Sequence, residues 1–259
     1  MENLALYEVK EHIAVITVND PDRLNPLSSK MFAALNGALD KAEADDDVYV
    51  VVFTGAGRSF IAGADITEMY DMTALECVQW GKVGGGFARR IEAFRKPTIA
   101  AVNGFALGGG CEVALGCDFI YASEKAKMGL PEVGLGVIPG FGGTLRLPRA
   151  IGIRRAKELA FQAKAVDAEE AYRLGLVNKV VPHDTLMDEV MAVAKNICAQ
   201  SQSAVRTVKY CMNTGVDVDI TSAMELENHA FGISFSTEDK RIGMGAFIRK
   251  EKEKTWANK

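Results

Sequence analysis

Residues 99–140 read IAAVNGFALGGGCEVALGCDFIYASEKAKMGLPEVGLGVIPG, and this stretch decides the fold because strand and helix patterns alternate within it. The apolar run at 98–102 predicts a buried strand, and three consecutive glycines then lead into a helix expected over 109–116. Two further strands are predicted near 118–122 and 127–130. This alternation is typical of a mixed α/β fold with crossover connections.

The chain before this stretch opens with a hairpin pattern. Residues 4–9 and 13–18 are rich in apolar and β-branched side chains, and the sequence NDPD that follows them is typical of a turn. Ser28 or Ser29 is expected to cap a helix whose apolar residues recur at helical spacing. Residues 49–54 then return as a buried strand, so the order of elements is ββαβ.

A second helical pattern, over residues 73–94, contains the glycine triplet Gly84, Gly85 and Gly86. The segment before it, residues 55–63, is rich in glycine and serine and is predicted to be a loop. Each glycine inside a helix is less favourable than alanine by roughly 1 kcal/mol. The triplet therefore indicates either a break between two helices or a mobile segment.

From residue 153 onward the patterns are mainly helical, and Pro182 is expected to act as the hinge into the last third of the chain. No internal repeat, heptad array or low-complexity tract interrupts this part. The expected helices cover 154–162, 167–174, 186–200, 204–213 and 220–235, with one short strand near 178–181.

Composition indicates an ordinary globular protein. At 259 residues, with 48% hydrophobic and 25% charged residues, the chain can bury a sizeable core in one large domain or a domain with a small appendage. The formal net charge of −4 and a pI near 5.6 give no overall attraction to nucleic acid or to an acidic membrane. Neither is therefore expected as a partner.

The sequence shows no targeting signal, no membrane span and no redox-active cysteine motif. The N-terminus has no basic region followed by a cleavage site, and the longest apolar runs, such as 48–53, are far too short to span a membrane. The cysteines are odd in number and form no C-x-x-C pair, which is typical of reduced, structural thiols and favours the cytoplasm. The five are Cys77, Cys111, Cys117, Cys198 and Cys211.

The glycine clusters do not fit nucleotide-binding motifs. Stretches that begin at Gly55, Gly134 and Gly140 each start as G-x-G but lack the third glycine of a dinucleotide-binding loop. No P-loop and no G-x-S-x-G elbow is present. The three histidines lie far apart in sequence and outside any Cys/His cluster, so no metal site is predicted.

Two glutamates, Glu112 and Glu132, follow segments built to leave backbone amides free. A helix that begins at Gly109 would point unsatisfied N–H groups toward an anion, and Gly63 would allow a sharp turn that exposes the amide of Ala64. Two carboxylates beside such donors suit proton transfer next to a developing oxyanion. The alternative is that both glutamates are solvated surface acids and the glycines merely allow close packing.

Beyond these local features, longer stretches along nearly the whole chain form a recognisable set: FIAGADI (60–66), PTIAAVNGFALGGGCE (97–112), LPEVGLG (130–136), PGFGGTLRLP (139–148), AYRLGLV (171–177), FSTED (235–239) and AF (246–247). By these stretches the chain resembles the crotonase superfamily of enoyl-CoA hydratases and isomerases, most closely short-chain hydratases. The resemblance implies a crotonase-like spiral of ββα units over residues 1–195 and a helical trimerisation region over 196–259, assembled as a homohexamer built from two trimers.

The resemblance also implies roles for individual residues. The amides of Ala64 and Gly109 match the oxyanion hole for the thioester carbonyl, Glu112 matches the group that activates water, and Glu132 matches the donor of a proton to C2. The substrate would be an acyl-CoA thioester, the product a 3-hydroxyacyl-CoA, and no separate cofactor or metal would be needed. One glutamate is expected to have a raised pKa because of its apolar neighbours. A place in fatty acid metabolism such as β-oxidation follows from the resemblance.

Contacts to coenzyme A are implied in the same way. The family binds adenine and pantetheine along the backbone of one segment and a neighbouring loop, and a second subunit reaches the nucleotide. Taken alone, Phe247 is predicted to be a core residue, and Lys250 equally fits a solvated cation in a charge run. The matching residues are Arg23, Leu24, Ala62, Ala64, Asp65, Ile66 and Gly109, with Phe247 and Lys250 from the neighbouring subunit.

Several alternatives stay open within this resemblance. An enoyl-CoA isomerase, a dehalogenase or a carnitinyl-CoA-type dehydratase would use the same scaffold, since a fold does not fix its reaction. Two glutamates favour a hydratase, because an isomerase can shuttle one proton with a single acid. An RNA-binding, non-catalytic role would need a basic surface that this chain lacks. Gly84 to Gly86 lie near the region that shapes the acyl pocket in the family, so a pocket-lid role is also open, and short acyl chains are expected.

Overall fold

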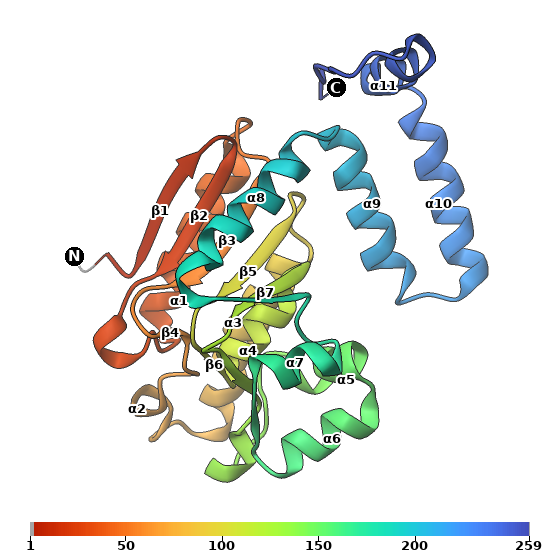
Figure 1. Ribbon diagram of the computed structural model, residues 1–259. Coiled ribbons are helices and arrows are strands. Elements are labelled where there is room, and N and C mark those ends of the chain that lie inside the picture. The colour runs from red at the N-terminus through yellow and green to blue at the C-terminus, as the bar shows by residue number, and fades with distance from the viewer. Residues whose placement is uncertain (1–2, 259) are drawn as a thin grey trace.

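The computed structural model describes residues 3–258 as an α/β fold with two sheets (Figure 1). The larger sheet has the strand order β1-β2-β3-β5-β7-β10, and the smaller has the order β4-β6-β8-β9. The strands are β1 (Ala5–Lys10), β2 (Ile13–Val18), β3 (Val50–Gly55), β4 (Ser59–Ile61), β5 (Thr98–Val102), β6 (Phe105–Leu107), β7 (Phe119–Ser123), β8 (Lys127–Gly129), β9 (Ala165–Asp167) and β10 (Lys179–Val181).

The larger sheet is parallel apart from its first strand, and this confirms the predicted hairpin and crossovers. β1 and β2 pair antiparallel, whereas β2, β3, β5, β7 and β10 pair in parallel. Val50 and Val52 of β3 pack against apolar residues of helix α8 (Leu186–Cys198) on one face of the sheet. Val51 and Phe53 face the main core on the other side. Burial on both faces explains why this strand reads as a continuous apolar run.

The strands of the smaller sheet were largely missed by sequence reasoning. β4 lies inside the segment predicted to be a glycine- and serine-rich loop, so that prediction is wrong for residues 59–61. β6 and β9 were not predicted at all. Strands of three residues are too short to show a period, and only their partners define them.

The helices confirm most of the predicted ones within one or two residues. Ser28 is the N-cap of the first long helix and accepts a hydrogen bond from Met31 N at 3.2 Å. Helices α5 and α11 were not predicted. The helices are α1 (Ser29–Ala44), α2 (Ile66–Met69), α3 (Ala74–Glu92), α4 (Gly109–Gly116), α5 (Gly143–Ile151), α6 (Ile153–Phe161), α7 (Ala168–Leu174), α8 (Leu186–Cys198), α9 (Gln202–Gly215), α10 (Ile220–Ser234) and α11 (Glu238–Arg249), with 3-10 turns η1 (Pro21–Arg23), η2 (Glu132–Leu135) and η3 (His183–Thr185).

Helix α3 runs unbroken through the glycine triplet, so the predicted break is wrong. A Cβ placed on Gly84 would lie 2.2 Å from Cε1 of Phe141, whereas a Cβ on Gly86 would meet nothing within 4 Å. Gly84 therefore lets the Phe141 ring pack directly against the helix backbone. This contact, together with the capping box of Thr73 and Glu76, offsets the poor helix propensity of glycine.

This difference gives a matched pair of stability predictions. Gly84→Ala is expected to lower the free energy of unfolding by about 1–3 kcal/mol, because the new methyl group overlaps a ring that has little room to move. Gly86→Ala, two residues away on the exposed side, is expected to raise it by about 0.5–1 kcal/mol through helix propensity alone. Urea unfolding of both variants measures the two changes. Equal effects in the two variants would contradict this account of the triplet.

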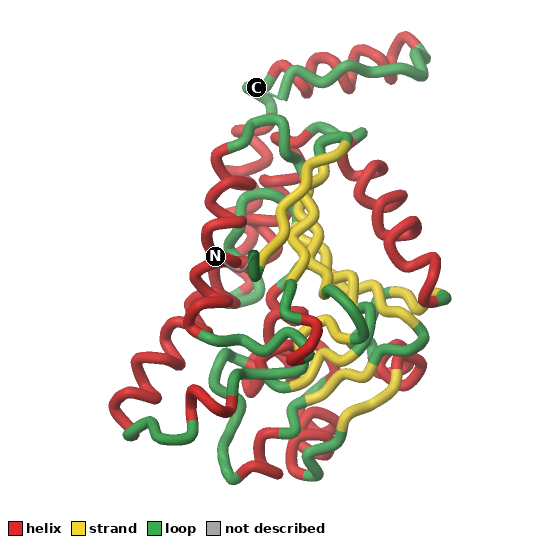
Figure 2. Tube along the Cα trace, turned by 90° about the vertical axis from the view of Figure 1, so that its left-hand side faces the viewer, coloured by secondary structure: helices red, strands yellow, loops and turns green. Residues whose placement is uncertain are grey.

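The last three helices extend away from the sheets as a separate layer (Figures 1 and 2). Lys209 of α9 attaches this layer to the core through an ion pair with Asp118, with 2.9 Å between Nζ and Oδ2. The buried carboxylate of Asp239 accepts hydrogen bonds from Ser201 Oγ at 2.5 Å and from the amides of Ala257 and Asn258, which returns the chain end to the start of α9. The domain boundary between residues 195 and 196 stays a prediction.

None of the helices formed by residues 3–258 is both long and apolar enough to cross a bilayer.

Candidate active site

Helix α4 begins where β6 ends, and glycines set its position. Gly108 has φ +51°, and a Cβ on Gly110 would lie 1.9 Å from the carbonyl oxygen of Ile61. Only glycine allows this approach, which brings the first turn of α4 against the last residue of β4. The N–H of Gly109, the first residue of the helix, has no intrahelical acceptor and lies at the positive end of the helix dipole.

A second free amide belongs to Ala64, which lies shortly after the end of β4. Gly63 turns the chain with φ +116°, and Ala64 forms a parallel bridge with Leu27. The hydrogen bonds of this bridge use neighbouring groups, from Leu27 N to Gly63 O and from Asp65 N to Leu27 O, both at 2.9 Å. Within residues 3–258 the amide of Ala64 is therefore left without a backbone acceptor. A Cβ on Gly108 would lie 4.0 Å from Gly63 Cα, so the segments that carry the two amides are in contact.

Glu112 lies in the first turn of α4 and is almost completely buried, with 1% of its surface exposed. Its Oε1 atom accepts hydrogen bonds from the amides of Phe141 at 2.8 Å and Gly143 at 2.7 Å, at the start of α5. Burial raises the pKa of this carboxyl, while the two amides and the charge of Arg146 oppose the rise. The interpretation of Glu112 as a solvated surface acid is wrong.

Glu132 is the first residue of η2, and its carboxyl is near enough to Glu112 for the two charges to interact. Its Oε1 atom lies 3.0 Å from the position of a Cβ on Gly108, so it sits at the entrance of α4. Its Oε2 atom is buried without a hydrogen-bond partner among the described residues. Burial raises the pKa of Glu132 to about 7, and the nearby charge of Glu112 adds to the rise.

These surroundings give the two carboxyls different chemistry. Hydrogen bonds from amides stabilise a carboxylate, so Glu112 is suited to take up a proton. Oε2 of Glu132 has no hydrogen-bond partner among the described residues, and burial raises the pKa of this carboxyl to about 7, so it keeps its proton into the neutral range and is suited to give one. Two free amides beside this pair can receive a developing negative oxygen. The site can therefore move two protons around one oxyanion.

The sequence profile of the enoyl-CoA hydratase/isomerase family matches residues 8–259. The chain belongs to this family.

Curated relatives and solved structures agree with this assignment. The short-chain-enoyl-CoA hydratase of Clostridium acetobutylicum is 46% identical over 99% of both chains, and the crotonyl-CoA hydratase of Syntrophomonas wolfei is 47% identical over 97% of this chain and 96% of its own. The crystal structure of an enoyl-CoA hydratase from Bacillus anthracis superposes with a TM-score of 0.95 at 34% identity, covering 99% of this chain and 100% of that one. The crotonase-like fold expected from the sequence is confirmed.

Most of the residues predicted to bind coenzyme A lie close together, in the two segments 23–24 and 62–66. Arg23 donates to Asp65 with 2.5 Å between Nη2 and Oδ2, and Ala62 N donates to Leu24 O at 3.1 Å. Asp65 is also the N-cap of α2. Ile66, the first residue of that helix, is half exposed. The structure thus brings the two predicted coenzyme A segments, residues 23–24 and 62–66, onto one face.

Phe247 and Lys250 are not part of this face. They lie on α11 and at its C-terminal cap, at the far end of the molecule from α2 (Figure 1). Phe247 is 83% exposed, so the prediction that it is a core residue is wrong for the single chain. Neither residue can reach the site of its own chain.

Sequence reasoning missed the groups that hold Glu112. Phe141 and Gly143 donate the two amide hydrogen bonds, and Arg146 contacts Phe141 in turn. The stretch PGFGGTLRLP supports the family resemblance, but its pattern alone assigns no role to any of its residues. Its three glycines were the available signal, since Gly142 has φ +101° and turns the chain into α5.

Proposed function

We propose that the protein is a short-chain enoyl-CoA hydratase, a hydro-lyase that adds water reversibly to a trans-2-enoyl-CoA and yields a 3-hydroxyacyl-CoA. One observation carries the proposal. Two carboxyls with unlike surroundings lie beside the free amides of Ala64 and Gly109: Glu112 is buried and accepts two amide hydrogen bonds, whereas Oε2 of the partly buried Glu132 has no hydrogen-bond partner among the described residues. The names of the two curated relatives support the short-chain substrate.

The proposed reaction assigns each group one step. The amides of Ala64 and Gly109 donate to the thioester carbonyl oxygen, which becomes negative as the conjugated double bond is attacked. Glu112 removes a proton from water, whose oxygen bonds to C3, and Glu132 delivers its own proton to C2. Donors that are fixed before the reaction stabilise this enolate-like state more than the substrate, each by roughly 3–4 kcal/mol.

The acyl-CoA would lie along the face formed by residues 23–24 and 62–66. The backbone of Ala62 to Ile66 would hold adenine and pantetheine, and Arg23, already paired with Asp65, would lie near the phosphates. Coenzyme A is part of the substrate, so we propose no resident cofactor and no metal. A place in fatty acid β-oxidation is consistent with this substrate class.

An enoyl-CoA isomerase is the second candidate, because it would use the same oxyanion hole. Glu112 is buried, Glu132 is partly buried, and the charges of the two carboxyls interact, whereas one proton carrier is enough to move a double bond. The retention of two differently tuned carboxyls favours hydration. A nucleic-acid or membrane partner is not proposed.

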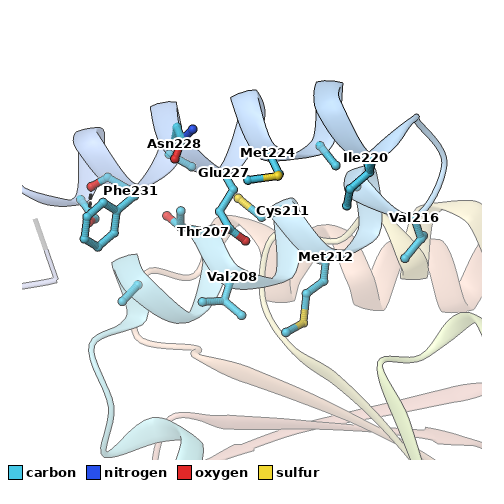
Figure 3. Close-up of a pocket in the computed structure, with 15 residues that line it drawn as sticks. Thr207, Val208, Cys211, Met212, Val216, Ile220, Met224, Glu227, Asn228 and Phe231 are labelled. Atoms are coloured by element: carbon cyan, nitrogen blue, oxygen red, sulfur yellow. Dashed lines mark hydrogen bonds between the residues drawn. The ribbon is translucent and has the colours of Figure 1, made fainter.

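We also propose a homohexamer built from two trimers. α9 and α10 face each other across an apolar groove of about 750 Å³ (Figure 3), and several large side chains there are exposed. Met212, Val216 and Ile220 are 67%, 74% and 76% exposed, respectively, which is unfavourable in water. Contact between subunits would cover this surface and would bring Phe247 and Lys250 to a neighbouring site. Light scattering after gel filtration measures the mass, and a monomer at micromolar concentration would contradict the assembly.

A cytoplasmic location is proposed on the basis of the cysteines. All five are free thiols, and Cys111 and Cys117 are buried in the core. Such thiols suit a reducing compartment.

The direct test follows the loss of ultraviolet absorbance when purified protein is mixed with crotonyl-CoA, whose conjugated thioester disappears on hydration. A series of longer and branched enoyl-CoA thioesters defines the acyl preference, and saturated butyryl-CoA serves as the control without a double bond. Rapid conversion of crotonyl-CoA to 3-hydroxybutyryl-CoA is expected. Conversion of a 3-enoyl-CoA to its 2-enoyl isomer, without hydration of either, would favour the isomerase instead.

A further inference from the structure

Arg146 on α5 contacts neither carboxyl directly but binds the loop that holds Glu112. Its Nη1 atom donates to the carbonyl oxygen of Phe141 at 3.0 Å, and Nη2 donates to Oε2 of Glu92 at 2.8 Å. Only 13% of its side chain is exposed. The guanidinium therefore joins the end of α3 to the loop at residues 139–143 from within the protein.

The loop is shaped to receive this side chain. A Cβ on Gly142 would lie 2.2 Å from Nη1 of Arg146, so the guanidinium rests directly on the loop backbone. Gly142 also has φ +101°, a conformation that other residues rarely adopt. On either side of Gly142, the amides of Phe141 and Gly143 both point to Oε1 of Glu112.

We infer that Arg146 is a positioning residue, which fixes the loop at 139–143 so that the amides of Phe141 and Gly143 hold Glu112 in place for attack by water. This inference rests on the proposed function, in which Glu112 is the base. A planar guanidinium bonds two acceptors through separate nitrogens held in one rigid plane, whereas the donors of an ammonium group share a single nitrogen and rotate freely. Misplacement of a reacting group by about 1 Å is sufficient to slow catalysis about 10²-fold.

The anchor of this arrangement is itself held in place. Glu92 is the last residue of α3, and its backbone carbonyl accepts a hydrogen bond from Asn213 Nδ2 of α9 at 2.8 Å. The side chain of Glu92 therefore has a fixed starting point when it binds Arg146. Among the described residues, the charged or titratable groups around Glu112 are Arg146, Glu132 and the buried thiol of Cys111. Arg146 is the only cation of this set.

Four variants test the inference by steady-state kinetics with crotonyl-CoA across pH. Arg146→Met removes both the fork and the charge, Arg146→Lys keeps the charge, and Glu92→Ala removes the anchor. The matched control is Arg149→Met, one turn later on α5, whose exposed side chain pairs with Asp217. Melting temperatures identify any variant that does not fold.

Arg146→Met is expected to lower kcat about 10²-fold with little change in KM, because substrate contacts are untouched. It is also expected to move the acidic limb of kcat to higher pH, since the cation opposes the rise in the pKa of Glu112. Arg146→Lys should keep the acidic limb of the kcat profile at its wild-type pH, because the charge remains, but its kcat should lie between those of Arg146→Met and the wild type. Glu92→Ala should lower kcat several-fold, and Arg149→Met should behave as wild type.

A wild-type kcat and an unchanged acidic limb of the pH profile in Arg146→Met would overturn the inference. If that variant does not fold, the test uses Arg146→Lys and Glu92→Ala. Full kcat in both of them would overturn the inference, and reduced kcat with unchanged KM would support it. Failure of the proposed function is separately visible. In that case Glu112→Gln and Glu132→Gln would keep full activity, whatever Arg146→Met does.

Discussion

Glu132→Gln is expected to lower kcat for crotonyl-CoA hydration by about 10²–10⁴-fold, the range that general acid catalysis contributes. Glutamine has nearly the same shape but holds no transferable proton, so C2 would lack its donor. KM should change little, because the oxyanion amides of Ala64 and Gly109 remain. Steady-state kinetics at saturating substrate measure the loss. Glu124→Gln, on an exposed turn, is the matched control and should keep wild-type activity.

The pH dependence offers an independent check of the role of Glu132. An acid catalyst must be protonated, and burial raises the pKa of Glu132 to about 7. The kcat/KM profile of the wild type should therefore fall on the alkaline side with a midpoint near that value. An activity that stays constant from pH 6 to pH 9 would assign the proton transfer to another group.

Stability should respond to pH in the opposite sense to a surface salt bridge. The pKa of Glu132 rises from an ordinary 4.5 to about 7 on folding, so the folded state favours its neutral form. The corresponding stability is fully present below the lower value and is lost as pH rises through the higher one. The Glu132→Gln variant should not lose this stability, because glutamine does not ionise. It should be more stable than the wild type at pH 8 and nearly equal to it at pH 4, as measured by urea unfolding at both pH values.

Glu112→Gln is the second variant expected to have a large effect, with kcat again lower by about 10²–10⁴-fold. The amide oxygen of glutamine can still accept hydrogen bonds from Phe141 and Gly143, so the loop should keep its position. What is lost is the ability to take a proton from water. A thermal melt close to that of the wild type is expected, because the substitution also removes a buried charge.

The two glutamate variants can be separated from each other. Loss of the base should remove the acidic limb of the pH profile, and loss of the acid should remove the alkaline one. Interacting carboxyls titrate as a pair, so both limbs are read from kcat/KM of the same preparations. If Glu112→Gln retained more than a tenth of wild-type kcat, water would need a different base, and the assignment of Glu112 would be withdrawn.

Much of the fold follows from patterns that the sequence carries locally. The apolar run of β3 and the helical spacing of α1 predicted their elements because burial on two faces and on one stripe leave distinct periods. The glycines before Glu112 predicted the free amide of Gly109 for a similar reason. A helix start without a side-chain cap leaves N–H groups unpaired, whatever surrounds it.

Other elements have no such local signal. β4, β6 and β9 have three residues each, and α5 contains Pro148, so neither period nor propensity identifies them. The glycine triplet of α3 misled because propensity was weighed without the Phe141 ring that requires Gly84. The prediction that Phe247 is a core residue is wrong because it relied on the usual burial of aromatic side chains. In the proposed assembly, the surface that covers Phe247 would belong to another subunit.

The sequence by itself determined the fold class, the family and the four groups proposed for catalysis: Glu112, Glu132 and the amides of Ala64 and Gly109. Only the tertiary structure decided how the two carboxyls differ. The donors to Glu112 come from residues 29 and 31 positions later, and Oε2 of Glu132 is buried without a hydrogen-bond partner among the described residues. A pKa depends on burial and on neighbours in space, and no spacing along a chain specifies which loop will close over a side chain.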